Sequence, residues 1–238
     1  MSDFPSAIAA VRDAVCGILR IRPVRPGAHE FQVAFVGTGW CFSPRRYLAT
    51  AHHVFDDGKA RNPSDKFYAF VVPDNGPVAY HAPVVAVPFE DPVIDMAILE
   101  VAPPASYRLS AVPVTFARPR DGSHVLTYGF PSPTIAAASV DQDGNWLGGN
   151  LLLKAHANEG IVAAQYDFGP HYSYELNVGW HHGESGGPIF SLEPLAAFAM
   201  MQSYRNIQSP HGVVAGPHMG RAMSVMTTAL TAHGATIV

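Results

Sequence analysis

The stretch Gly183-Glu184-Ser185-Gly186-Gly187-Pro188 is the most informative part of the sequence, because it sets a serine among glycines. A serine hydroxyl is a weak nucleophile unless a base lies beside it and hydrogen-bond donors receive the oxyanion that its attack creates. Glycine at 183 allows the backbone to turn so that its N–H converges with that of Ser185. We therefore predict that Ser185 is a nucleophile and that the N–H groups of Gly183 and Ser185 form an oxyanion hole.

Two other interpretations of this stretch exist. The first is an ordinary glycine-rich turn before a strand, which would explain a lone Gly-Ser-Gly better than it explains this run of six residues. The second is the nucleophile elbow of α/β-hydrolases, Gly-x-Ser-x-Gly, which needs a helix directly after the serine and then an acid and a histidine. Gly186-Gly187-Pro188 disfavours a helix, and Glu193 is the only carboxylate side chain after Ser185. The elbow is therefore the less favoured interpretation.

The histidine pair His52-His53 follows the apolar, β-like run Tyr47–Ala51 and supplies the candidate base. Imidazole can accept and return a proton near neutral pH, and the end of a strand holds it rigidly. The alternatives are a structural polar pair and a metal site. Neighbouring residues of a strand point to opposite faces, so the two rings are poorly placed to bind one ion. These residues alone do not decide between His52 and His53.

Asp95 directly precedes the apolar run Met96–Val101, so we expect it at the mouth of a buried strand. A carboxylate there can accept a hydrogen bond from an imidazole N–H, fix the tautomer of the ring and stabilise the imidazolium. A solvated loop acid is the common alternative, and Asp91, which precedes a proline, is the competing acid. The candidate base, orienting acid and nucleophile then follow one another in the order histidine, aspartate, serine.

Many short apolar or alternating runs, separated by 21 glycines and 21 prolines, predict an all-β barrel or sandwich. A stiff connector, Ala102-Pro103-Pro104-Ala105-Ser106, divides these runs into two series. Short helices are expected over residues 6–15 and 225–233. The predicted strands are Cys16–Arg22, Phe31–Val36, Gly39–Phe42, Tyr47–Ala51, Phe67–Val72, Val84–Val87, Met96–Val101, Val112–Phe116, His124–Tyr128, Leu151–His156, Gly160–Tyr166, Ser173–Asn177, Pro188–Phe190, Leu195–Gln202 and Gly212–Ser224.

The composition restricts the partners that are expected. The 238 residues carry a net charge of −4 without a basic cluster, which argues against nucleic-acid binding. The sequence shows neither a signal peptide nor an apolar run long enough to cross a membrane, and it has only two cysteines, Cys16 and Cys41; together these predict a cytoplasmic protein. The loop Asp141–Gly149 has an Asp-x-Asp-Gly pattern, but a surface turn is favoured over a calcium loop, so no metal or cofactor is predicted.

The motifs of the chain resemble those of the trypsin-like (chymotrypsin-fold) serine peptidases, nearest to the bacterial HtrA-type and glutamyl-endopeptidase-type branch. The resemblance implies two antiparallel six-stranded β-barrels and a short C-terminal helix. It implies His53 rather than His52 as the base, because the family histidine lies three positions after the motif threonine. The motifs that carry it are Gly37-Thr38-Gly39-Trp40, Leu48-Ala49-Thr50-Ala51-His52-His53-Val54, Asp95-Met96-Ala97-Ile98-Leu99, Tyr128-Gly129-Phe130-Pro131 and Gly183-Glu184-Ser185-Gly186-Gly187-Pro188.

The domain organisation that this resemblance implies has three parts. Residues 1–102 are expected to form an N-terminal helix and a first barrel carrying His53 and Asp95. Residues 103–224 are expected to form a second barrel carrying Ser185, and residues 225–238 the C-terminal helix. The site would then lie between the two barrels, where active sites are often found.

Three departures from the family pattern matter. Secreted members pair a freed Ile-Val-Gly-Gly terminus with the acid before the serine; that sequence is missing here, although Glu184 stands in the place of the acid. Either the site is preformed, or something else orders it. Val54 stands where secreted members carry a cysteine of the disulfide beside the histidine. Many members also have a serine near Met200 that supports the aspartate, so its absence predicts one fewer hydrogen bond on Asp95.

The specificity pocket is also implied by the resemblance rather than by local chemistry. Its base would lie at Gly179, where there is no acid, so a demand for Lys or Arg is not expected and small or medium apolar P1 residues are favoured. We expect a serine endopeptidase that cleaves protein or peptide substrates through an acyl-enzyme, under the control of a regulatory protein partner or of narrow specificity. A catalytically silent binding module and an esterase are the alternatives. The implied pocket residues are Gly179, Trp180, His182, Met200, Met201 and Gln202.

Overall fold

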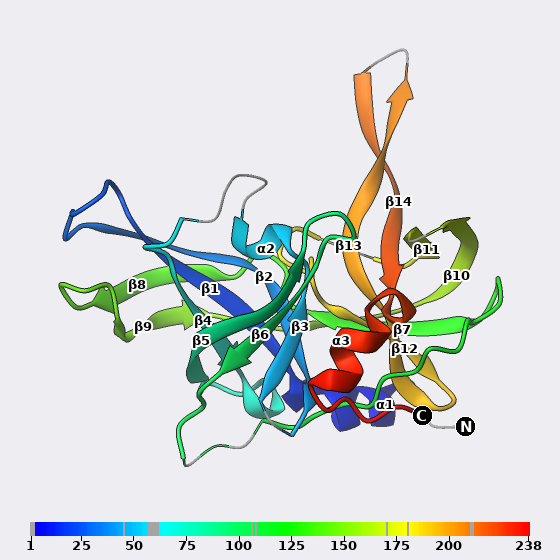
Figure 1. The fold of residues 1–238 in the computed structure, drawn as a ribbon, viewed down its shortest axis with the longest axis horizontal. Coiled ribbons are helices and arrows are strands. Elements are labelled where there is room, and N and C mark those ends of the chain that lie inside the picture. Colours follow the sequence, from blue (N-terminus) through cyan, green and yellow to red (C-terminus); the bar gives the residue numbers. More distant parts are fainter. Residues whose placement is uncertain are drawn as a thin grey trace.

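A computed structural model of the protein describes residues 3–44, 46–56, 62–105, 107, 109–169, 171–179, 181–209 and 212–238. It is built from two closed, six-stranded antiparallel barrels (Figure 1), which confirms the predicted all-β architecture. The first barrel closes in the order β1-β2-β3-β6-β5-β4. Its strands are β1 (Val15–Pro23), β2 (Phe31–Ser43), β3 (Tyr47–Thr50), β4 (Lys66–Val71), β5 (Tyr80–Asp91) and β6 (Met96–Val101).

The second barrel closes in the order β10-β11-β14-β13-β12-β7. Two of its strands, β13 and β14, continue beyond the barrel as a two-stranded ribbon (Figure 1). One predicted strand, Val112–Phe116, is instead an extended segment in which Val114 forms isolated bridges to Ala197 and to Ile237. The strands of this barrel are β7 (His124–Gly129), β10 (His156–Phe168), β11 (His171–Asn177), β12 (Pro188–Leu192), β13 (Leu195–Ser209) and β14 (Gly212–Ala222).

A separate hairpin of β8 (Thr134–Val140) and β9 (Trp146–Leu152) replaces the predicted strand Leu151–His156. It comes from the second half of the chain, yet it packs on the first barrel: the Trp146 ring meets the Phe70 ring edge-on at 5.3 Å, and Trp146 N donates to Tyr68 Oη at 3.0 Å. At its tip, Asp141 Oδ1 accepts from Asp143 N at 2.9 Å and Asn145 N at 2.7 Å. The predicted surface turn is therefore the turn of a hairpin, with its first aspartate used to close it.

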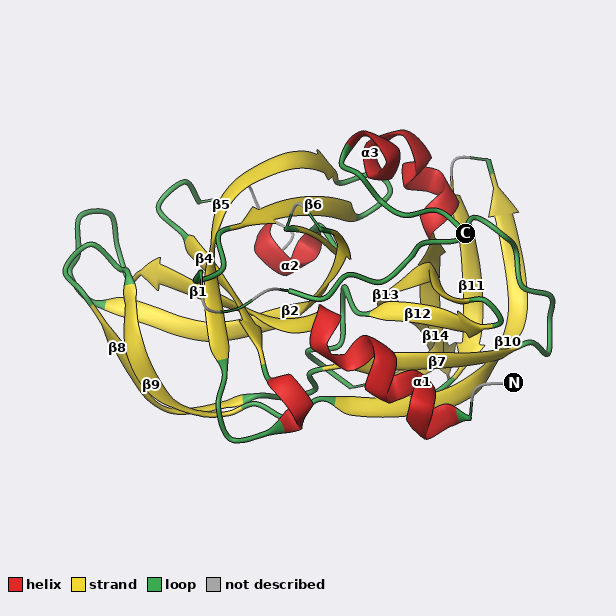
Figure 2. Ribbon diagram, turned by 90° about the horizontal axis from the view of Figure 1, so that it is seen from below, coloured by secondary structure: helices red, strands yellow, loops and turns green. Residues whose placement is uncertain are grey.

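The helices are short and lie near the ends of the chain and beside the barrels. Asp3 caps α1 (Phe4–Val11) by accepting from Ser6 N at 2.9 Å, and Pro5 suits the first turn. Figure 2 shows α1 beside the second barrel, and Phe4 lines the same cavity as His124 of β7 and Leu192 of β12. The others are η1 (Arg12–Ala14), α2 (His53–Asp56), η2 (Pro73–Asn75), η3 (Met223–Met226) and α3 (Thr227–Ala232).

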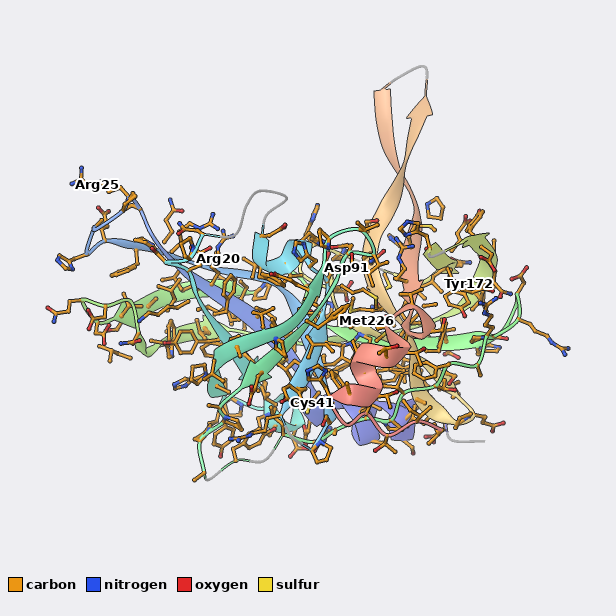
Figure 3. All side chains as sticks on the ribbon, in the orientation of Figure 1. Arg20, Arg25, Cys41, Asp91, Tyr172 and Met226 are labelled. Carbon is orange, nitrogen blue, oxygen red and sulfur yellow. The ribbon has the colours of Figure 1, made fainter. Side chains whose placement is uncertain are left out.

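Each barrel is filled by inward-facing apolar side chains. Cys16 and Cys41 are free thiols buried in the first barrel, and Figure 3 shows Cys41 among its packed side chains. The C-terminal segment closes against this barrel too, since the His233 ring meets the Tyr47 ring at 4.8 Å. No helix in the described ranges is long and apolar enough to cross a membrane. The largest fully buried side chains include Trp40, Phe42, Phe55, Phe130, Tyr174, Phe190 and Phe198.

Candidate active site

His53 and Asp95 meet because of the pairing of β3 with β6. These strands are antiparallel, with Thr50 opposite Ala97, so the end of β3 lies beside the start of β6. His53 begins α2 just after β3, and Asp95 is the last residue of the turn before β6. The distances from His53 Nδ1 to Asp95 Oδ2 and Oδ1 are 2.9 and 3.1 Å, and the backbone His53 N donates to Oδ1 at 2.9 Å.

This double attachment sets the chemistry of the His53 ring. A carboxylate only accepts hydrogen bonds, so Nδ1 carries the proton and Nε2 keeps its lone pair. Burial lowers the pKa of His53, but the hydrogen bond and charge of Asp95 and the charge of Asp56 outweigh it, so the pKa lies above the ordinary value of 6.5. The His53 side chain is still 39% exposed, which leaves the ring accessible to a substrate.

The neighbouring His52 belongs to a different set of contacts. Its Nδ1 lies 3.1 Å from Asp56 Oδ2 and its Nε2 lies 3.8 Å from Glu90 Oε2. Its ring is nearly buried and meets the Phe55 ring edge-on at 5.0 Å. The competing acid Asp91 is likewise occupied, because its Oδ1 accepts from Val93 N at 2.8 Å and Ile94 N at 3.2 Å. Of the four candidates, His53 and Asp95 are the two that face each other.

Ser185 lies on a loop that packs directly against the segment before His53. Its carbonyl accepts from Thr38 N at 2.8 Å. Gly186 has a φ of +84°, and a Cβ added there would meet Thr38 O at 2.2 Å and Thr50 Oγ1 at 2.4 Å. The Ser185 hydroxyl donates to the Gln202 carbonyl at 3.3 Å. Among the described residues it makes no hydrogen bond to His53.

Around Ser185, two backbone N–H groups have no acceptor among the residues that the structure describes. Ser132 N donates to His182 O at 2.8 Å, and because the N–H of a trans peptide points opposite to its C=O, Gly183 N–H points away from Ser132. Glu184 N, Gly186 N and Gly187 N each donate to a protein carbonyl. Within the described part of the chain, Gly183 N and Ser185 N do not. A pair of free donors beside a serine hydroxyl can receive the oxygen of a polarised carbonyl.

Glu184 lies between these two donors in the sequence, and its carboxylate accepts one hydrogen bond from a side chain and one from the backbone. It is buried; its Oε2 accepts from His181 N at 2.6 Å and its Oε1 from Asn158 Nδ2 of β10 at 3.3 Å. Burial raises the pKa of the Glu184 carboxyl, and the two hydrogen bonds offset this only in part. Asn158 and the backbone of the 181–184 turn thus supply the two hydrogen bonds that the structure records for the Glu184 carboxylate.

Replacing Asn158 by alanine should therefore loosen the loop. It removes the only side chain donor that the structure records for a buried carboxylate, so we expect the free energy of unfolding to fall by about 1–3 kcal/mol. Denaturant unfolding measures this. Asn150→Ala, on the exposed part of β9, is the matched control and should change stability by less than about 0.5 kcal/mol. Equal stability of the two variants would contradict the role given to Asn158.

The residues predicted around the specificity pocket separate into different environments. Gly179 lies against Asn158, since an added Cβ would be 3.1 Å from Asn158 Oδ1, and His182 is exposed. Trp180 lies outside the described residues. Met200 and Met201 are fully buried, one in each of two core clusters. Gln202 is nearly buried, and its amide Nε2 donates to Ile94 O at 2.7 Å and Asp95 O at 3.1 Å.

Two residues that support the site, Asn158 beside Glu184 and Arg221 beside Gln202, were not predicted from the sequence. Asn158 and Arg221 lie in ordinary strand sequence, and nothing local distinguishes them. Gln202, predicted as a pocket residue, donates to the backbone carbonyl of Asp95, whereas the recorded hydrogen bonds of the Asp95 carboxylate are all with His53. A signal for Gln202 existed, because a polar residue ending the apolar run Leu195–Met201 must find hydrogen-bond partners once it is buried.

Comparisons with known proteins agree with this geometry. A profile of the family described as trypsin-like peptidase domain matches residues 37–194, a range that includes His53, Asp95 and Ser185. Among solved structures, the chain is similar to the serine endoprotease from Yersinia pestis, with a TM-score of 0.60 and 17% identity over 98% of this chain and 66% of that chain. At this identity the likeness shows the fold. No curated protein sequence matches.

Proposed function

The chain belongs to the trypsin-like peptidase domain family, and from this premise we propose that it is a serine endopeptidase that works through an acyl-enzyme. Ser185 is the nucleophile, His53 the general base and acid, and Asp95 the group that orients His53. The N–H groups of Gly183 and Ser185 bind the oxyanion. The observation that carries the proposal is the His53–Asp95 pair, which fixes the tautomer of the ring and leaves Nε2 able to take a proton.

In the proposed reaction, His53 accepts the proton of Ser185 and then donates it to the leaving group. When the Ser185 oxygen attacks the substrate carbonyl, its proton passes to His53 Nε2, and the carbonyl oxygen becomes an oxyanion between the two N–H donors. His53 then protonates the leaving amine, and the acyl-enzyme forms. A water molecule repeats the same steps and frees the carboxylic acid. Throughout, Asp95 stays ionised and stabilises the imidazolium form of His53.

A catalytically silent binding module on the same fold is the second candidate, and one observation favours it. The Ser185 hydroxyl donates to Gln202 O rather than to His53. A rotation about the Cα–Cβ bond of Ser185 would redirect the hydroxyl, and catalytic hydrogen bonds are often made only once substrate is bound. The two candidates therefore differ in whether Ser185 becomes nucleophilic.

Labelling with a fluorophosphonate separates these candidates. The endopeptidase should be labelled on Ser185, and Ser185→Ala should not be labelled at all, with both proteins shown to be folded by circular dichroism. Candidate regulatory proteins are added in a second arm, because control by a partner is part of the proposal. Wild-type protein that is labelled no more than Ser185→Ala in both arms would leave the silent module as the function.

The pH dependence of kcat/KM should report the raised pKa of His53. The base is active only when neutral, so activity falls as pH drops through the pKa of His53 in the free enzyme. Because that pKa is raised by Asp95 and Asp56, the midpoint of the acid limb should lie above the ordinary histidine value of 6.5. Rates on a peptide substrate from pH 5 to pH 9 measure it. A midpoint below 6.5 would contradict the assignment.

We also propose a preference for small or medium apolar P1 residues, because the expected base of the pocket, Gly179, carries neither a side chain nor an acid that would bind Lys or Arg. Cleavage of a proteome-derived peptide library, with Ser185→Ala as the control, gives the P1 preference directly. Uniform cleavage of unrelated unfolded proteins by the isolated chain would argue against narrow specificity and against control by a partner.

A further inference from the structure

Asp95 has an unusual backbone conformation for the residue that faces His53. Its φ of +56° lies in the left-handed region, which residues other than glycine seldom adopt. Such a conformation persists when the surroundings fix it. The recorded hydrogen bonds of the Asp95 carboxylate are all with His53, so any other hydrogen-bonded anchor recorded for Asp95 acts on its backbone.

Gln202 holds the two peptide groups on either side of the Asp95 Cα. Its Nε2 donates to Ile94 O at 2.7 Å and to Asp95 O at 3.1 Å. The dihedral angles φ and ψ of Asp95 are set by the planes of these two peptides. One amide group that binds both carbonyls therefore fixes the conformation of Asp95. The residue comes from β13 of the second barrel, whereas Asp95 belongs to the first.

Arg221 fixes the orientation of the Gln202 amide. Its Nε donates to Gln202 Oε1 at 3.2 Å. A guanidinium can only donate and the two carbonyls can only accept, so the amide oxygen faces Arg221 and the NH2 group faces Ile94 and Asp95. Arg221 lies opposite Met200 in the pairing of β13 with β14, so the second barrel sets its position as well.

The backbone of the same segment contacts the Ser185 loop. The Gln202 carbonyl accepts from Ser185 Oγ at 3.3 Å, and the preceding carbonyl, of Met201, accepts from Gly186 N at 2.7 Å. Gln202 is thus bonded through its side chain to the turn that carries Asp95 and through its backbone to the loop that carries Ser185. In the described structure these contacts join the acid of one barrel to the serine of the other.

We propose that Gln202, oriented by Arg221, is a positioning residue that holds Asp95 in the left-handed conformation in which its carboxylate faces His53. The inference rests on the proposed peptidase function for its effect on turnover. Its structural part, the control of the His53–Asp95 contact, does not depend on turnover. Loss of the Gln202 amide frees the turn, lengthens the Asp95–His53 hydrogen bonds and weakens the orientation of the base.

The test uses methionine as a substitute of similar length that lacks the donors. Gln202→Met removes both hydrogen bonds to the turn. Gln165→Met is the matched control, because Gln165 Nε2 donates to Asp121 Oδ1 at 2.8 Å and the recorded hydrogen bonds of Gln165 are with Asp121 and Tyr172 rather than with the turn that carries Asp95. Arg221→Met and Arg221→Gln form a second pair. Both remove the charge, but glutamine keeps an N–H donor at the same number of bonds from Cα as the arginine Nε.

The first readout is the NMR titration of His53 in a Ser185→Ala background, assigned with a His53→Gln variant. The low-field resonance of the Nδ1 proton is followed in the same samples. In Gln202→Met and Arg221→Met, the His53 pKa should fall toward its ordinary value and the low-field resonance should weaken. Gln165→Met should match the parent, and Arg221→Gln should keep a higher His53 pKa and a stronger low-field resonance than Arg221→Met. Asp56, which also raises the His53 pKa, is unchanged in every variant. Arg221→Met and Arg221→Gln both lack the guanidinium charge, so the difference between them does not include its effect.

The second readout is turnover of a peptide substrate, measured in variants that keep Ser185. Gln202→Met should lower kcat by about 10-fold to 100-fold with KM changed by less than about 3-fold, because misplacement of a catalytic group acts on the chemical step. If Gln202→Met does not fold, the Arg221 pair decides. Folded variants of Gln202 and Arg221 that titrate and turn over like Gln165→Met would overturn the proposal. Absence of peptidase activity in the wild type would instead count against the proposed function and leave the titration result standing.

Discussion

Replacement of Asp95 by asparagine is expected to lower kcat on a peptide substrate by on the order of 10⁴-fold at neutral pH. The Asp95 carboxylate accepts from both the backbone N and the ring Nδ1 of His53. An asparagine amide offers only one acceptor oxygen, and its NH2 group would favour the tautomer in which Nδ1 accepts and Nε2 carries the proton. That tautomer cannot take the proton of Ser185. Because the charge of Asp95 no longer raises the His53 pKa, the remaining activity should also have an acid limb whose midpoint is lower than that of the wild type.

The matched control is Asp91→Asn, four residues away in the same turn. Asp91 uses a single oxygen, Oδ1, to accept from two backbone N–H groups, and an asparagine oxygen can do the same. Its kcat should stay within about 3-fold of the wild type. The assignment of Asp95 would be wrong if both variants lost activity equally, or if Asp95→Asn kept a kcat within 10-fold of the wild type.

Replacement of Gly183 by alanine is expected to lower kcat by about 10²–10³-fold, the effect of losing one oxyanion donor. Gly183 has a φ of +102°, and an added Cβ would lie 2.5 Å from Phe130 O and 3.0 Å from Ser132 N. Because both contacts are to backbone atoms, the 182–183 peptide has to rotate, and the N–H of residue 183 then leaves the position that faces Ser185. The measurement is kcat, together with the rate of fluorophosphonate labelling.

Gly122→Ala separates this effect from the cost of a positive φ. Gly122 has a φ of +82°, yet an added Cβ there meets nothing within 4 Å. It should lose about 1 kcal/mol of stability and keep its kcat. Equal kcat losses in the two variants would show that strain in the fold, rather than the oxyanion donor, controls the activity of Gly183→Ala.

The parts of the fold and site that could be predicted from the sequence are those that local chemistry determines. Glycine at 183 was predicted to allow a turn beside Ser185, and its φ is positive. The apolar runs before His53 and after Asp95 do become β3 and β6. Antiparallel pairing of β3 with β6 is enough to place the residue after one strand beside the residue before the other, and so to bring the two side chains together.

The parts that could not be predicted depend on long-range register or on weak patterns. Strand β8 (Thr134–Val140) is rich in alanine and has no alternation of polar and apolar residues, so nothing marked it as a strand. The donor Gln202 and the carbonyl of Ile94 are 108 positions apart and meet only once both barrels are closed. Asn158 reaches Glu184 in the same way, across 26 positions. Such pairs follow from the completed topology rather than from any short motif.

The two ends of the chain rest on opposite barrels, and this has a consequence for how the protein comes apart. Phe4, at the start of α1, lines a cavity with residues of β7 and β12, while the His233 ring, beyond α3, meets the Tyr47 ring of β3. The hairpin β8–β9 likewise belongs to the second half of the chain and covers Phe70 of the first barrel. Neither half can bury all its apolar surface until the whole chain has left the ribosome. We therefore expect the barrels to gain and lose their structure together, as one cooperative unit rather than as two domains.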